Sequence, residues 1–288
     1  MDCVRPEGRH TSAEGADVEP KRPRGQRLLQ PKRSIPRRIY VMAAASTFIV
    51  VLVVWCAVTY THLVKPFFLP SPTQVLRAAV SLFTEFDLLR DMRDSFYRVT
   101  VAFVLSVVLA VPIGLLMGTY KIAEAVISPI NEFIRYMPVP AFIPLCILWI
   151  GIGNNSQIAL IFIGTFFQLL VLVADIAAQT PGEYLDASYT VGVGRLAVLR
   201  HVVLPNAMPG VFDNVRVSFG WAWSYLLLAE IVGANTGLGH MIMESQRFLR
   251  TDNVIAGVLI IGLIGVLIDL AFRGAYAALF PWTEKQTR

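Results

Sequence analysis

Residues 136–174 read YMPVPAFIPLCILWIGIGNNSQIALIFIGTFFQLLVLVA, a run of 39 residues without one charged side chain. A helix needs about 20 apolar residues to cross the hydrocarbon core of a bilayer, so this run predicts two crossings. The turn formers of Gly151–Gln157 mark the break between them. We therefore predict spans at residues 132–151 and 157–178, the first of them kinked or partly unwound because its prolines remove backbone hydrogen bonds.

Four further apolar stretches complete the predicted membrane domain. Each is long enough to cross a bilayer, and they lie at residues 41–60, 97–120, 209–232 and 252–275. With 55% hydrophobic and 16% charged residues among 288, the chain is also too apolar for an ordinary soluble domain. The sequence thus predicts an all-α membrane protein with six transmembrane helices within residues 39–288.

The basic segment at residues 1–38 predicts the orientation. It carries ten Lys/Arg and five Asp/Glu among Pro and Gly, a composition that favours disorder. Positive charge directly before a first span holds that side in the cytoplasm, and we favour this role over binding to nucleic acid. Six crossings then place both termini and residues 179–206 in the cytoplasm. Arg247 and Arg250 would lie on the outer side of the membrane, which runs against the positive-inside bias.

The sequence lacks the signatures of catalysis. It contains no Gly-Lys-Ser/Thr loop, no His-Glu-x-x-His and no Gly-x-Ser-x-Gly. Cys3, Cys56 and Cys146 have no paired spacing and the four histidines are scattered, so we expect no metal site and no cofactor in this chain. If ATP drives the protein, another chain binds it. A secondary transporter is the alternative, although the two halves show no internal repeat.

The polar segment at residues 179–206 predicts two short amphipathic helices. Tyr184–Val191 can form the first, which Gly192 ends, and Leu196–Val203 the second, which ends before Pro205. Such a pair would lie along the inner face of the membrane. Its shape suits docking into a groove of a partner protein, where a helix presents a few apolar anchors.

This segment resembles the EAA loop of binding-protein-dependent ABC importer permeases: Glu-Ala-Ala, three residues, Gly, nine residues, then Ile-x-Leu-Pro. Here Asp186-Ala187-Ser188 is followed by Gly192 and Val202–Pro205 at the same spacing. Asp for Glu and Ser for Ala are departures from the pattern. The resemblance implies an ATPase-coupling site at Asp186, Ala187, Ser188, Gly192, Arg195, Leu196, Leu199, Leu204 and Pro205. Within it, we expect Gly192 to form the turn and Leu196 and Leu199 to pack into the ATPase.

The resemblance extends over residues 69–282. Further matching blocks lie at Leu69–Thr73, Pro138–Pro144, Trp149–Gly153 and Ala229–Gly239, and they look like the nitrate/sulfonate/taurine/bicarbonate branch. This branch implies a type I ABC importer permease fold in the inner or plasma membrane of a prokaryote, and a small anion as cargo. Its implied partners are a second permease subunit, as a homodimer, two ATPases that hold ATP and Mg²⁺, and an external solute-binding protein.

Polar residues inside the predicted spans are candidates for the substrate pathway, because buried ionisable groups are costly in a membrane. Arg216, Trp223 and Glu230 are spaced by seven and share one helix face; Thr165 and Gln168 form a sparser stripe. Arg216 could bind an anion or extend to the cytoplasmic headgroups. Glu230 could contact the binding protein or cap a helix.

Overall fold

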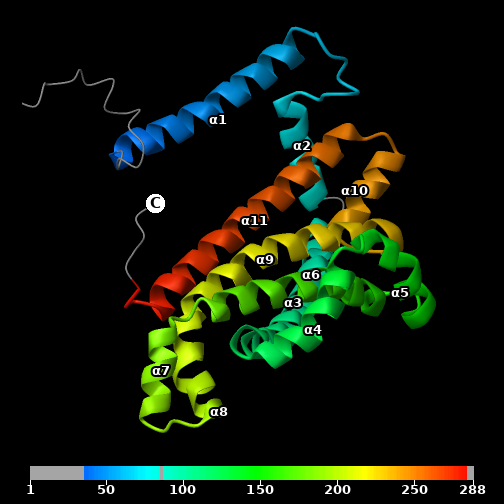
Figure 1. The fold of residues 1–288 in the computed structure, drawn as a ribbon. Helices are drawn as coiled ribbons and strands as arrows, with labels where there is room; N and C mark the ends of the chain where they lie inside the picture. The colour runs from blue at the N-terminus through cyan, green and yellow to red at the C-terminus, as the bar shows by residue number, and fades with distance from the viewer. Residues whose placement is uncertain (1–35, 85–86, 284–288) are drawn as a thin grey trace, which may run out of the picture. The chain divides into compact units, whose positions relative to one another are not determined.

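The structure, a computed structural model, describes residues 36–84 and 87–283, and these residues form helices and no strand. Most of the predicted basic tail, residues 1–35, lies outside the described residues. In chain order the helices are α1 (Arg37–Tyr60), α2 (Pro72–Thr84), α3 (Leu88–Thr119), α4 (Lys121–Arg135), η2 (Val139–Phe142), α5 (Ile143–Ile150), α6 (Asn154–Ala178), α7 (Gly182–Thr190), α8 (Arg195–Val198), η3 (Leu199–Val203), α9 (Leu204–Gly233), α10 (Leu238–Arg247) and α11 (Thr251–Leu279). The predicted all-α class is confirmed (Figure 1).

Helix α1 is described by itself, because the chain divides into two compact units, Met1–Trp55 and Cys56–Arg288. Its 24 residues carry no charge after Arg38. At 1.5 Å per residue the helix is about 36 Å long, which is enough to cross a bilayer.

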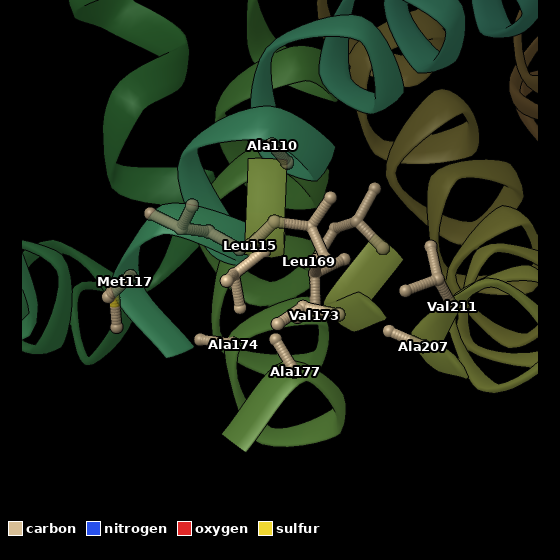
Figure 2. Close-up of a cluster of buried hydrophobic side chains, with 12 residues drawn as sticks. Ala110, Leu115, Met117, Leu169, Val173, Ala174, Ala177, Ala207 and Val211 are labelled. Carbon is tan, nitrogen blue, oxygen red and sulfur yellow. The ribbon is translucent and has the colours of Figure 1, made fainter. Parts of the chain in front are cut away.

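The second unit is built around α3, α6 and α9, which pack along one another. Figure 2 shows the buried side chains that these helices share, among them Ala110, Leu169 and Val211. Gly114 and Gly118 let α3 approach α6 closely: a Cβ at Gly118 would overlap the Ala174 carbonyl oxygen. Small residues four apart allow this kind of close packing in membranes.

Four helices are long and apolar enough to cross a membrane, namely α1, α3, α6 and α11, when the described residues are searched. A bent pair, in which Lys121–Arg135 and Val139–Ile150 meet at 89°, makes a fifth crossing if the two helices act as one span. The predicted span at residues 132–151 therefore runs around this bend. Pro138 and Pro140 explain the break, because each lacks a backbone N–H and disfavours a helical conformation in the residue before it.

Helix α9 is longer than the span predicted at residues 209–232. Pro205 does not end the preceding helix as expected, because the π-helical turn η3 joins α8 to α9 without interruption. A π turn widens the helix where the proline removes a hydrogen bond, so the chain continues through Pro205. Helix α9 also carries Asp213, Arg216 and Glu230, which make it less apolar than the four helices above.

Candidate functional site

Residues 179–206, which run from the end of α6 into the first residues of α9, contain a hairpin of two short helices. Figure 1 shows α7 and α8 projecting together beyond one end of α6 and α9. We call residues 179–206 the coupling segment. It is the part of the second unit in which both candidate helices and the predicted glycine turn lie.

Gly192 makes the turn between α7 and α8. Its φ of 81° is in the left-handed region, where a side chain is strained. The Gly192 N–H donates to the Tyr189 carbonyl (2.9 Å) and the Val193 N–H to the Ser188 carbonyl (3.1 Å). This pair of bonds is the Schellman motif, which satisfies the last carbonyls of a helix. Gly192 is therefore the residue that turns the chain between α7 and α8, because the motif requires a left-handed conformation at this position.

Apolar side chains of the coupling segment divide between two faces. Leu185, Val193 and Leu199 pack against the buried core cluster of α3, α6 and α9. On the other face, Val191 is 83% and Leu196 75% exposed. Leu196 is therefore free for a partner, whereas Leu199, the second predicted anchor, is half-buried and packs against this cluster.

The remaining predicted coupling residues also separate by exposure. Asp186, Ala187, Arg195 and Pro205 are exposed, whereas Ser188 and Leu204 are half-buried. The Ser188 hydroxyl donates to the Tyr184 carbonyl inside α7 (2.6 Å).

A side-chain hydrogen bond ties the α8 end of the coupling segment to the bundle. The Tyr120 hydroxyl, between α3 and α4, donates to the Arg195 carbonyl at 2.9 Å. Together with the packing of Leu185 and Val193, this bond holds one face of the hairpin against the bundle and leaves its other face open.

The predicted pathway residues do not form one lining. Thr165 is completely buried, and its hydroxyl bonds to Ser106 (2.8 Å) and to the Ile161 carbonyl (2.7 Å). Gln168, one turn further along α6, is half-buried. Glu230 is also completely buried. Thr165 and Glu230 therefore hold helices together in this structure.

Arg216 and Trp223 do border open space. A cavity of about 340 Å³ between α9 and α11 is lined by both of them. Arg216 is a quarter exposed and lies 3.7 Å from Asp213 and 3.6 Å from Asp269. These two residues of the predicted stripe are the ones that a solute could reach.

Glu230 is the centre of a buried polar network at the opposite end of the bundle from the coupling segment. Its Oε1 accepts from Arg98 Nη1 (2.7 Å) and from the Ser95 hydroxyl (2.6 Å), while Oε2 accepts from the Gly239 N–H (2.8 Å). Arg98 is 3% exposed. A buried ion pair with this many partners joins α3, α9 and α10 firmly.

Arg98 reaches two more segments. Its Nη1 and Nη2 donate to the carbonyl and hydroxyl of Thr236 (2.7 and 2.9 Å), and its Nε donates to Asn154 Oδ1 at the start of α6 (2.9 Å). Sequence reasoning missed Arg98 as a functional residue. The signal was present, because an arginine next to an apolar run within a predicted span is a candidate site by default.

Comparisons with known proteins agree with this architecture. Residues 110–285 match the family model described as "Binding-protein-dependent transport system inner membrane component". The taurine transport system permease protein TauC of Escherichia coli K12 is 32% identical over 247 residues, covering 84% of this chain and 90% of its own length. A putative aliphatic sulfonates transport permease protein SsuC of Bacillus subtilis is 29% identical over 233 residues, covering 81% of this chain and 84% of its own length.

Solved structures show the same fold at lower sequence identity. A chain of the MetNI methionine ABC transporter, in an inward-facing conformation, superposes with a TM-score of 0.62 at 21% identity and covers 68% of this chain and 97% of its own. The predicted type I ABC importer permease fold is thereby confirmed. The family consists of transport subunits, and it sets aside both a secondary transporter and an enzyme. This multi-pass membrane chain belongs to the family of binding-protein-dependent transport system inner-membrane components.

Proposed function

We propose that the chain forms the transmembrane passage of an ATP-driven importer for a small sulfonate such as taurine. Supporting this cargo, a relative named for taurine transport is 32% identical over 84% of the chain, and two relatives are named for aliphatic sulfonates. The proposal includes a cytoplasmic position for both termini, a second copy of this chain, an external solute-binding protein, and ATPase subunits that bind ATP and Mg²⁺.

The observation that carries the proposal is the exposed outer face of the coupling segment. Val191 and Leu196 are large, exposed apolar side chains. Arg195 directly precedes Leu196, and Asp186 lies five residues before Val191; both are exposed. A short helix that offers a few apolar anchors and flanking charges suits a groove on a partner. We assign direct contact with the ATPase to the exposed residues Asp186, Ala187, Arg195, Leu196 and Pro205, and a supporting role to Ser188, Gly192, Leu199 and Leu204.

The continuity of α8, η3 and α9 gives a route for the motion of the ATPase. Because no loop separates the coupling segment from α9, a displacement of α8 moves α9 with it. Helix α9 carries Arg216 and Trp223 at the cavity described above. Closure of the ATPase on ATP can in this way change the passage without any chemistry in this chain.

Two glycines of the coupling segment provide a matched test. Gly192 has φ 81° and Gly194 φ −68°, and a Cβ at either would meet no atom within 4 Å. Gly192→Val forces a branched residue into the left-handed region, at about 1–3 kcal/mol, whereas Gly194→Val fits an extended backbone. In proteoliposomes with the cognate ATPase and binding protein, we expect taurine uptake and substrate-stimulated ATP hydrolysis to fall about tenfold in Gly192→Val alone.

Each part of the proposal has its own contrary result. Full coupling in Gly192→Val would refute the docking role of the coupling segment. Uptake that proceeds without ATP would refute the importer. A complete wild-type system that hydrolyses ATP but takes up neither taurine nor an alkanesulfonate would refute the cargo.

A further inference from the structure

Two hollows of the second unit meet at Trp223. The inner hollow, about 340 Å³, lies between α9 and α11 and is lined by Arg216, Gly220, Gly265 and Asp269, among others. The outer hollow, about 470 Å³, is lined by residues of α3 and α11, including Arg93, Phe96, Tyr97 and Ile264. Trp223 belongs to both linings, so its ring stands where one hollow ends and the other begins.

The Trp223 ring is held by other aromatic rings. It makes an edge contact with Phe96 (6.3 Å between centroids) and stacks near Phe219 (6.4 Å). The side chain is 7% exposed, and its indole N–H is buried without a hydrogen-bond partner. An unsatisfied buried donor is unfavourable, so ring packing has to hold this conformation.

The inner hollow presents two opposite charges, Arg216 and Asp269, that are only loosely paired with each other; Arg216 also lies 3.7 Å from Asp213. Arg216 Nε lies 3.6 Å from Asp269 Oδ1, beyond an ordinary hydrogen bond, and Nε has no hydrogen-bond partner. Asp269 Oδ2 accepts from Arg273 Nε at 2.7 Å, which holds the carboxylate in place. Phe219 and Phe272 form apolar walls beside this pair.

We propose that the two hollows are successive compartments of a passage for a small zwitterion. Arg216 binds its anionic group, Asp269 binds its ammonium group, and Trp223 closes the passage between the compartments. An amino-sulfonate carries a group of opposite charge for each of Arg216 and Asp269, whereas a solute with a negative charge alone pairs with Arg216 and offers no partner to Asp269. The inference rests on the proposed transport function and narrows its cargo from small sulfonates in general to amino-sulfonates.

Cysteine labelling tests the passage without relying on transport. A Cβ at Gly265, in the inner hollow, or at Gly274, outside its lining on the same helix, would meet no atom within 4 Å. Each is changed to Cys in the assembled importer after Cys3, Cys56 and Cys146 are replaced by Ala. The probe is the membrane-impermeant anion methanethiosulfonate ethylsulfonate, added to either side of membrane vesicles.

We expect Gly265→Cys to react from the α7–α8 side and to react slowly from the opposite side. Trp223→Ala should raise the rate from the opposite side about tenfold, through loss of its two ring contacts, and leave Gly274→Cys unchanged. Failure of Gly265→Cys to react from either side would place this face against lipid or a second subunit and overturn the passage. An unchanged rate in Trp223→Ala would overturn the barrier.

Protection from labelling tests the zwitterion. Taurine and ethanesulfonate share the sulfonate, but ethanesulfonate lacks the ammonium group. Taurine should slow labelling of Gly265→Cys by neutral methyl methanethiosulfonate more than ethanesulfonate does, and Asp269→Asn should abolish that difference. Equal protection by both, or none by either, would overturn the assignment. Because labelling is read without transport, an importer that does not carry taurine refutes the proposed cargo while the labelling rates still decide the passage.

Discussion

Breaking the Arg98–Glu230 ion pair should destabilise the protein far more than breaking an ion pair of the same length at the surface. We choose Arg98→Leu, which removes the guanidinium and keeps an apolar side chain in its place. The Arg98 Nη1–Glu230 Oε1 distance is 2.7 Å, with side chains 3% and 0% exposed. Lys121 and Glu124 also lie 2.7 Å apart, but their side chains are 91% and 44% exposed. The two ion pairs therefore have the same N–O distance and differ in how far their side chains are buried.

The expected magnitude follows from what Glu230 loses. In Arg98→Leu the Glu230 carboxylate keeps the Ser95 hydroxyl and the Gly239 N–H but has no positive charge near it. Removing one partner of a buried ion pair costs about 3–5 kcal/mol. At about 2–4 °C per kcal/mol for a chain of this size, the apparent melting temperature should fall by on the order of 10 °C. Lys121→Met should cost below about 0.5 kcal/mol.

A double variant separates the ion pair from general damage to packing. Arg98→Leu with Glu230→Leu leaves neither charge buried, so its cost should be about 2 kcal/mol below the sum of the two single changes. The measurement is thermal unfolding of the detergent-solubilised chain, followed by the fraction that stays monodisperse after heating. Additive effects of the two single changes would refute a stabilising interaction between Arg98 and Glu230. An Arg98→Leu variant as stable as Lys121→Met would refute it as well.

Two further predictions concern glycines where the backbone or a neighbour leaves no room. Gly118→Leu pushes α3 against the Ala174 carbonyl and should lower the free energy of unfolding by about 1–3 kcal/mol or more. Gly262→Leu should be tolerated, because a Cβ there would meet no atom within 4 Å. Equal melting temperatures of the two variants would contradict the close α3–α6 packing. Gly237→Ala places a Cβ against Glu230 and Arg98 at φ 117° and should cost about 1–3 kcal/mol, with Gly274→Ala as its neutral control in the same heating assay.

The helices of this fold follow closely from apolar run length, but their ends do not. The bend between α4 and α5 was foreseeable, because prolines at residues 138 and 140 each remove a backbone donor. The continuation of α8 into α9 was not. Pro205 normally indicates a helix end, and only the π turn of η3 lets the chain pass through it. Such a turn is set by packing against neighbouring helices, which sequence periodicity does not report.

The candidate site was predictable in part, for a related reason. Gly192 was identified because a turn residue with a left-handed conformation is usually glycine, which is visible in the sequence. Helix-face arguments were weaker: Glu230 shares a stripe with Arg216 and Trp223, yet it is bound by Arg98 rather than exposed to a passage. A helical stripe indicates the direction in which a side chain points. The residue that binds this side chain can belong to a helix distant in sequence, as Arg98 of α3 does for Glu230 of α9.

The two ends of α9 are held in different ways, and this difference bears on how the passage could open. At the Glu230 end, the buried network joins α9 to α3 and α10. At the Leu204 end, α9 continues into the exposed hairpin, which a partner can move. Arg216 lies 14 residues from Glu230, about 21 Å, and Trp223 half as far. A rigid α9 that pivots at Glu230 by about 10° therefore moves Arg216 by about 4 Å and Trp223 by about 2 Å. In the proposed mechanism, the inner hollow would change shape more than the Trp223 barrier, and the Arg98–Glu230 pair would be the fixed point against which the coupling segment moves α9.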